Sequence, residues 1–290
     1  MNAERGYGLL ILAVLCVSVG SIFVRLAGAP ALAVAFNRIF LASVVVAPFA
    51  APSLVRAWPA LSSRRRLILL ASGISLGVHF ATWIASLSYT SVAASVLLVN
   101  TAPLFTLFFS WWFLGERASR AVLVAMAVAL TGAALIAAGD WGDGGTASLK
   151  GDALALAGAV TLSLYHVIGR GLRDALPLSA YVLGVWSTAA ATLAVLAASA
   201  RVPVFGYPAR TFALFLALAV VPTVIGHGLV NRSLRHIPAP TVGLFLLGEP
   251  IAASILAYAV FGEMPGLLTI AGGVLVLAAL ALVVRSEGGA

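Results

Sequence analysis

Charge and cysteine are both scarce in this 290-residue sequence. Charged residues make up 9% of the chain, where a soluble domain has roughly 25%, so a water-soluble fold is excluded. The single cysteine, Cys16, excludes an intrachain disulfide. The connections between apolar runs are short and leave no room for a soluble domain. The phosphate-binding pattern G-x-x-x-x-G-K-[ST] is absent, so ATP is not the energy source within this chain.

Apolar residues dominate what is present. They make up 62% of the chain, and the mean hydropathy is +1.11. A helix needs roughly 20 apolar residues to cross the bilayer core, and continuous rather than alternating runs favour helices over a β-barrel. We therefore predict an all-α integral membrane protein with transmembrane helices near 7–24, 31–50, 67–88, 91–113, 119–138, 152–169, 177–199, 211–231, 239–261 and 265–284, joined by loops that include 51–66 and 139–150.

The start of the chain allows a second interpretation. Arg5 precedes the first apolar run and Ala27-Gly28-Ala29 follows it, as in a cleaved secretory signal. The run at 7–24 is longer than the usual signal core of about 7 to 15 residues, and its removal would leave an unequal number of helices in the two halves of the chain. We therefore interpret it as a transmembrane helix.

The two halves, 1–145 and 146–290, repeat one pattern of five helices. A shift of 147 residues superposes Pro103 on Pro250 and Gly115-Glu116 on Gly262-Glu263, and a shift of 145 aligns Gly6 with Gly151. An odd number of helices in each half places the second half upside down relative to the first, which is typical of a carrier.

Charge predicts the orientation. With a cytoplasmic N-terminus, the outside connections carry four basic residues, namely Arg25, Lys150, Arg201 and Arg210. The inside connections carry twelve, namely Arg5, Arg56, Arg64, Arg65, Arg66, Arg117, Arg120, Arg170, Arg173, Arg232, Arg235 and Arg285. Because basic residues favour the cytoplasmic side, both termini are predicted to be cytoplasmic.

Several motifs resemble one family. They are Phe36-Asn37-Arg38, Leu87-Ser88-Tyr89-Thr90-Ser91-Val92-Ala93-Ala94, Pro103 with Gly115-Glu116, and Gly248-Glu249-Pro250 with Gly262-Glu263. Together with the ten predicted helices, they resemble the drug/metabolite transporter superfamily, EamA type. The resemblance implies a carrier that exports small metabolites. The chain looks most like bacterial inner-membrane exporters of aromatic and other amino acids.

A carrier built from inverted repeats binds its substrate near the bilayer midplane. The candidate substrate-binding residues near this depth are His79 and Trp83, Asn100 and Thr101, and Ser163 with His166. His227 and Trp186 are weaker candidates. His79 and Trp83 are four residues apart and so share a helix face. For each candidate, a hydrogen bond or packing contact within or between helices is the structural alternative.

Two charges, Arg38 and Glu249, are predicted to lie inside the membrane, where a lone charge is costly. They are candidates for ion coupling or for a structural role between helices.

Other function classes lack support. Metalloprotease (H-E-x-x-H) and hydrolase (G-x-S-x-G) patterns are absent, so an enzyme is disfavoured. The histidines have no i, i+4 pair, and neither a metal nor a cofactor is predicted.

The basic residues lie in scattered connections, which excludes nucleic acid as a partner. The expected partners are lipid and a small-molecule substrate, and the alternatives are an exporter of other metabolites or drugs, or a passive channel. Gly73 and Gly77 fit packing within one chain, so the oligomeric state stays open and includes a monomer.

Overall fold

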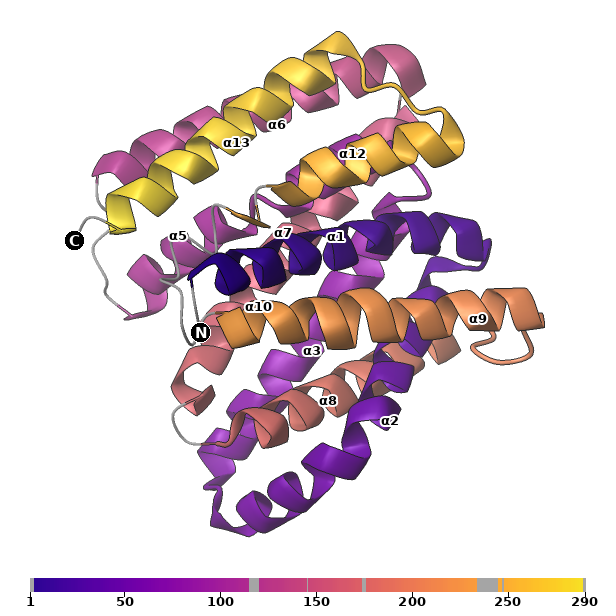
Figure 1. The fold of residues 1–290 in the computed structure, drawn as a ribbon, viewed down its shortest axis with the longest axis vertical. Coiled ribbons are helices and arrows are strands. Elements are labelled where there is room, and N and C mark those ends of the chain that lie inside the picture. Colours follow the sequence, from indigo (N-terminus) through magenta and orange to yellow (C-terminus); the bar gives the residue numbers. More distant parts are fainter. Residues whose placement is uncertain are drawn as a thin grey trace.

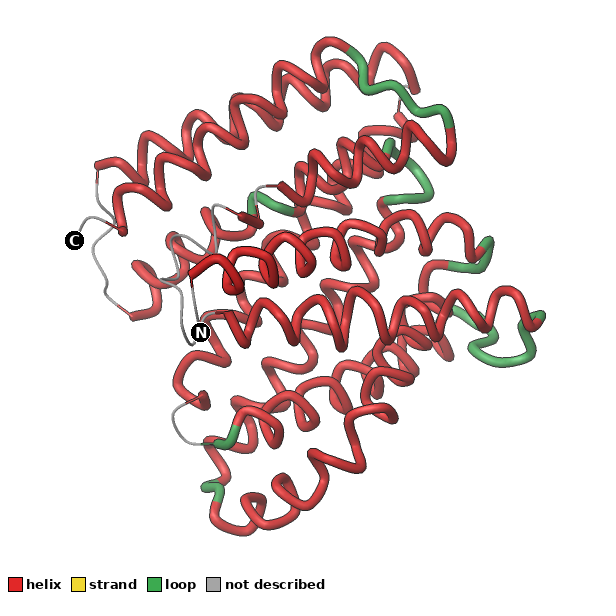
Figure 2. The backbone as a smooth tube through the Cα atoms, in the orientation of Figure 1, coloured by secondary structure: helices red, strands yellow, loops and turns green. Residues whose placement is uncertain are grey.

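The structure is a computed structural model that describes residues 3–114, 120–144, 146–173, 176–233, 245–246 and 248–288. All regular secondary structure in these residues is helical (Figure 2). The first half contains α1 (Ala3–Ala27), α2 (Ala31–Ala57), the short helix η1 (Trp58–Ala60), α3 (Ser63–Ser86), α4 (Val92–Val99), α5 (Ala102–Leu114) and α6 (Arg120–Gly144). The second half contains α7 (Thr146–Arg173), α8 (Leu178–Ser199), α9 (Ala209–Leu218), the π-helical segment η2 (Ala219–Gly226), α10 (His227–Ser233), α12 (Gly248–Phe261) and α13 (Leu267–Gly288).

Length and hydropathy identify the chain as an integral membrane protein. Among the described residues, 7 helical segments are long and apolar enough to cross a bilayer, and three shorter apolar helices are Leu123–Gly139, Gly248–Phe261 and Leu267–Leu282. Large apolar side chains on the outer surface include Phe49, which is 85% exposed, and Val195, which is 67% exposed. Such side chains are stable at these positions because they face lipid. The predicted all-helical membrane protein is confirmed.

Several predicted boundaries are wrong. The predicted loop at 139–150 is helical over 139–144 and 146–150, and α2 continues to Ala57 through Pro48 and Pro52. Hydropathy marks only the part of a helix inside the hydrocarbon, whereas backbone hydrogen bonding extends the helix into the interface. The predicted helix at 239–261 is described at 245–246 and from Gly248 onward.

Two predicted continuous helices are interrupted near a proline. The segment 91–113 divides into α4 and α5 at Asn100-Thr101, just before Pro103. The segment 211–231 changes to π-helical geometry at η2, which contains Pro222. Proline lacks the N–H that would continue the α-helical hydrogen-bond ladder, and its ring crowds the preceding turn.

Most contacts between helices join the first half to the second. The main pairs are α3 with α7 and α8, α2 with α8 and η2, α1 with η2 and α12, α4 and α5 with α7, α4 with α12, and α6 with α13. Figure 1 shows α6 and α13 side by side, with α1 between α12 and α10. α1 begins and α13 ends at the same end of the bundle, on the left in Figure 1.

Glycines allow these close approaches. A Cβ atom added at Gly132 of α6 would lie 2.6 Å from the carbonyl oxygen of Gly272 in α13. Gly73 and Gly77 of α3 face Thr188 and Thr192 of α8. These glycines therefore pack helices within one chain, as small residues do between membrane helices.

Candidate functional site

Arg38 in α2 lies at the centre of a group of polar and aromatic side chains from both halves. Its side chain is charged, yet the residue is 2% exposed. Nε donates a hydrogen bond of 2.9 Å to Oγ1 of Thr223, and Cζ lies 4.6 Å from the ring centroid of Phe80 and 5.4 Å from that of Trp83. The hydrogen bond and the two cation–π contacts offset part of the cost of burying the charge.

The π-helical segment positions Thr223. The Thr223 hydroxyl donates to the carbonyl oxygen of Leu218 at 2.8 Å, so its lone pairs are directed toward Arg38 Nε. Gly20 of α1 lies against Pro222, where an added Cβ would be 3.5 Å from the proline Cβ. Single turns of π-helix often occur at functional sites. Thr223 was not predicted from the sequence, although the adjacent proline in the middle of an apolar run was a signal for it.

His79 lies beside Trp83 in α3, as the i, i+4 spacing predicts. Their rings are parallel within 1°, with centroids 6.1 Å apart, and the two residues are 6% and 7% exposed. His79 Nδ1 is 2.9 Å from the carbonyl oxygen of Gly158 in α7. Because a carbonyl only accepts, Nδ1 carries the hydrogen, and Nε2 of the neutral ring is an acceptor.

Asn100 and Glu249 connect the break between α4 and α5 to the start of α12. Asn100 Nδ2 donates to the carbonyl oxygen of Val96 at 2.9 Å, and its side chain interacts electrostatically with the carboxyl group of Glu249. Glu249 lies near the beginning of the described part of α12. Within the described residues Arg38 and Glu249 interact electrostatically but form no ion pair.

Two predicted residues direct their hydroxyls to the backbone. Ser163 is fully buried and donates at 2.7 Å to the carbonyl oxygens of Ala102 in α5 and Ala159 in its own helix. Thr101 is 3% exposed and donates to the carbonyl oxygen of Leu98 at 2.6 Å. Both show the structural hydrogen bonds that the sequence left open as the alternative to substrate binding.

The other predicted residues surround the Arg38 group unequally. His166 of α7 is half-buried beside Tyr165, with ring centroids 5.0 Å apart, and interacts electrostatically with His79. His227 is exposed and interacts electrostatically with Arg38. Trp186 packs against the apolar core instead.

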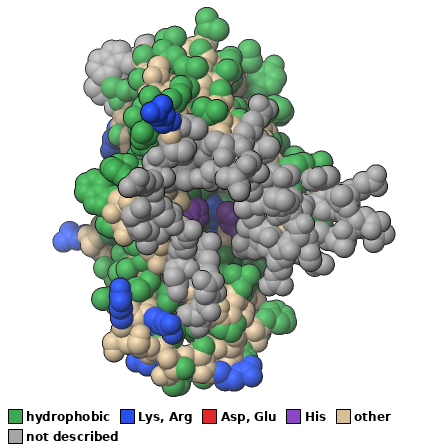
Figure 3. Space-filling view, turned by 90° about the vertical axis from the view of Figure 1, so that its left-hand side faces the viewer, with side chains coloured by type: hydrophobic (Ala, Val, Ile, Leu, Met, Phe, Trp, Pro, Cys, Tyr) green, Lys and Arg blue, Asp and Glu red, His purple; other side chains and the backbone are tan. Residues whose placement is uncertain are grey.

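The bundle is hollowed at one end (Figure 3). Figure 3 shows that end, at which α1 begins and α13 ends, and histidine and basic side chains are visible inside the hollow.

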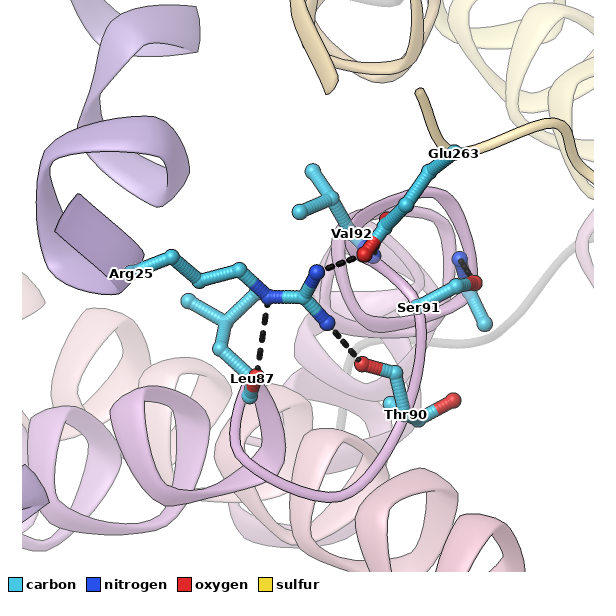
Figure 4. A network of polar contacts seen from close by, with 7 residues as sticks. Arg25, Leu87, Thr90, Ser91, Val92 and Glu263 are labelled. Atoms are coloured by element: carbon cyan, nitrogen blue, oxygen red, sulfur yellow. Dashed lines mark hydrogen bonds and ion pairs between the residues drawn. The ribbon is translucent and has the colours of Figure 1, made fainter. Parts of the chain in front are cut away.

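An ion pair joins the two halves at the other end of the bundle. Arg25 of α1 pairs with Glu263, which follows α12, and the two side chains are 23% and 26% exposed. Arg25 also donates to the carbonyl oxygens of Leu87 at 3.0 Å and Thr90 at 2.7 Å, and Glu263 accepts from the backbone N–H of Val92 at 3.1 Å (Figure 4). We call these five residues the Arg25 network. The sequence identified Arg25 as an outside charge and Glu263 as a motif residue but did not pair them.

Sequence comparison identifies relatives over the whole chain. Residues 4–138 and 149–285 each match the model of the EamA-like transporter family. An uncharacterized transporter of Archaeoglobus fulgidus is 26% identical over 97% of this chain and 96% of its own. A probable terminal-alkyne amino-acid exporter of Streptantibioticus cattleyicolor is 29% identical over 86% of this chain and 82% of its own. The pseudopaline exporter CntI of Pseudomonas aeruginosa is 27% identical over 79% of each chain.

Structural comparison supports the same architecture. One solved crystal structure superposes with a TM-score of 0.65 over 98% of this chain and 99% of the other, at 18% sequence identity. At this identity the likeness concerns the fold alone.

Proposed function

Because the chain belongs to the EamA-like transporter family, we propose that it is a secondary transporter that exports amino acids, including aromatic ones, by alternating access. The observation that carries the proposal is the buried group around Arg38, in which aromatic, imidazole and amide side chains of the first half meet Thr223 and Glu249 of the second half. The protein would act without a cofactor, as a transporter rather than an enzyme.

Inverted repeats of residues 1–145 and 146–290 account for the helix pairs. An inverted repeat relates each predicted helix of the first half to the helix at the same place in the second half, so that α1 corresponds to α7 and α3 corresponds to the helix containing η2. The contact of α3 with α7 then has a counterpart in the contact of η2 with α1, and both contacts are present. The pairs α2 with α8, α4 with α12 and α6 with α13 exchange into themselves. The two matches to the family model support the same division. Carriers of this kind bind substrate between the repeats.

The two ends of the bundle support one state of an alternating-access cycle. The hollow opens at the end where the termini lie, and the Arg25 network holds the halves together at the other end. With both termini in the cytoplasm of a bacterial inner membrane, this is the inward-facing state. Export then requires the Arg25 network to open while the hollow closes.

The site chemistry fits an amino acid with an apolar side chain. The Trp83 and Phe80 rings offer an aromatic surface, and His79 Nε2 is an acceptor for a substrate ammonium. Pro103 cannot donate to the carbonyl of Val99, which provides a second acceptor beside Asn100. His166 would contribute from α7, whereas Thr101 and Ser163 would shape the site through their backbone hydrogen bonds.

Glu249 acts as a fixed link in this proposal. Its electrostatic interaction with Asn100 connects the broken helix of the first half to α12 in the second half. The competing role is proton coupling, which a carboxyl group inside the membrane could also perform.

Counterflow in proteoliposomes tests the transport function. Wild-type protein should exchange labelled for unlabelled Phe, Trp, Tyr, Leu or Met, whereas a channel shows no trans-stimulation and an enzyme changes the compound. His79→Ala and Asn100→Ala should reduce exchange at unchanged expression, because each removes a substrate hydrogen bond. Ser72→Ala is the matched control, since it removes an α3-to-α7 hydrogen bond two helical turns from His79. Unchanged exchange in both variants would move the site elsewhere.

A further inference from the structure

Two hydrogen-bond donors beside the site have no acceptor. Within the described residues, Arg38 Nη1 and Trp83 Nε1 are buried and have no hydrogen-bond partner. They belong to adjacent side chains, because the Arg38 Cζ atom lies 5.4 Å from the Trp83 ring centroid. Buried donors of this kind are rare in native proteins and call for an explanation such as a ligand.

The contacts of Arg38 show which part of its guanidinium is available. Nε is used by Thr223, and the rings of Phe80 and Trp83 lie against the group. Gly20 of α1 lies near Nη1, because a Cβ added at Gly20 would be 3.9 Å from this nitrogen. As a glycine, it offers no side-chain acceptor to Nη1. A residue serving only as an anchor between helices would have its remaining N–H groups bonded to protein. Here Nη1 is left for another molecule.

We propose that Arg38 Nη1 and Trp83 Nε1 bind the carboxylate of the transported compound, so that Arg38 is a substrate-binding residue and a carboxylate is required for transport. This inference rests on the proposed transport function and deepens it. Guanidinium and indole N–H groups only donate, and an ionised carboxylate only accepts. Its two oxygens match two donors on adjacent groups, whereas a phosphate would leave further charged oxygens without partners.

The donors are closed to solvent in this state, which explains how binding is linked to movement. Gly20 of α1 and Pro222 of η2 belong to different halves, and a Cβ added at Gly20 would lie 3.5 Å from Pro222 Cβ and 3.9 Å from Arg38 Nη1. A carboxylate reaches Nη1 only when these two elements separate, so binding favours a rearrangement between the repeats. Ligand binding shifts a conformational equilibrium by its difference in affinity for the two states.

Matched substrate pairs test the proposal. Counterflow is measured in proteoliposomes with L-phenylalanine and L-phenylalaninamide, L-leucine and L-leucinamide, and with lactate, citrate and phenethylamine. Wild-type protein should carry only compounds with a carboxylate. Trp83→Phe keeps the aromatic ring but removes Nε1–H, and it should raise the KM for the acids about tenfold, as expected for loss of a hydrogen bond to a charged group. Arg38→Lys, which keeps the charge without the planar fork, should also raise this KM.

The control and the outcomes separate this inference from the proposed function. The control is Trp58→Phe, which alters a second Arg–Trp pair on the surface, where Arg66 Cζ lies 5.2 Å from the Trp58 ring centroid. This variant should leave the KM unchanged. Transport of the amides with the same KM as the acids, or an unchanged KM for the acids in a folded Trp83→Phe variant, overturns the carboxylate site while transport stands. Transport of lactate or citrate without any amino acid supports the carboxylate site and overturns amino-acid export. Transport of phenethylamine alone overturns both.

Discussion

The ion pair between Arg25 and Glu263 should control the end of the bundle opposite the hollow. Glu263→Gln removes the charge of the pair but keeps an oxygen that accepts from Val92 N–H. The two side chains are less than one-third exposed. The free energy that the pair contributes to the closed state should therefore lie between that of a surface salt bridge, about 0.2–1 kcal/mol, and that of a hydrogen bond to a charged group, about 1.5–3 kcal/mol. An intermediate loss of about 1.4 kcal/mol shifts the equilibrium toward the opened state about tenfold.

Accessibility of an introduced cysteine measures this shift. Ile84 is fully buried and lines a cavity of about 350 Å³ beside Arg25, so Ile84→Cys in a Cys16→Ser background reports on opening. A water-soluble maleimide should label it about tenfold faster when Glu263→Gln is added, because opening precedes labelling.

A charge removed nearby provides the control. The Nζ atom of Lys150 lies 4.1 Å from the ring centroid of Tyr89, and Lys150 is outside the Arg25 network. Lys150→Gln should therefore leave the labelling rate unchanged. Exchanging the charges, with Arg25→Glu and Glu263→Arg together, should restore part of the closed population. Equal labelling with and without Glu263→Gln would refute a role of the pair in closing this end.

Three further predictions concern coupling, packing and topology. Glu249→Gln should retain both counterflow and transport driven by a pH gradient, because a glutamine amide keeps a polar group beside Asn100; loss of the gradient-driven transport alone would assign the carboxyl to proton coupling. Gly132→Val should lower the melting temperature in detergent, because an overpacked contact costs about 1–3 kcal/mol of folding free energy. Gly8→Val is the control, because no atom lies within 4 Å of a Cβ added there. Equal melting temperatures of the two variants would contradict the packing. Reporters at Asp143 and the C-terminus should lie on opposite sides of the membrane, and finding them on one side would contradict ten transmembrane helices.

The sequence alone determined that the chain is a helical membrane protein that resembles a transporter family. Hydropathy is a local property, because each apolar run must be long enough to cross the bilayer whatever its neighbours are. The i, i+4 spacing likewise predicted that His79 and Trp83 are neighbours. Hydropathy did not predict the interruption of the helix at 91–113, because both sides of the break at Asn100-Thr101 are equally apolar.

Only the tertiary structure decided the partners of the polar residues. Arg38 bonds Thr223, which is 185 positions away, and Arg25 pairs with Glu263 across the two halves. His79 hydrogen-bonds the backbone carbonyl of Gly158, and the sequence gives no signal of this contact because glycine has no side chain. Hydropathy places a helix in the membrane without fixing its rotation, so it cannot tell whether a hydroxyl such as that of Ser163 faces a substrate or another backbone. Helix packing between the repeats fixes those rotations, and through them it decides which polar groups are already bonded and which remain available to a substrate.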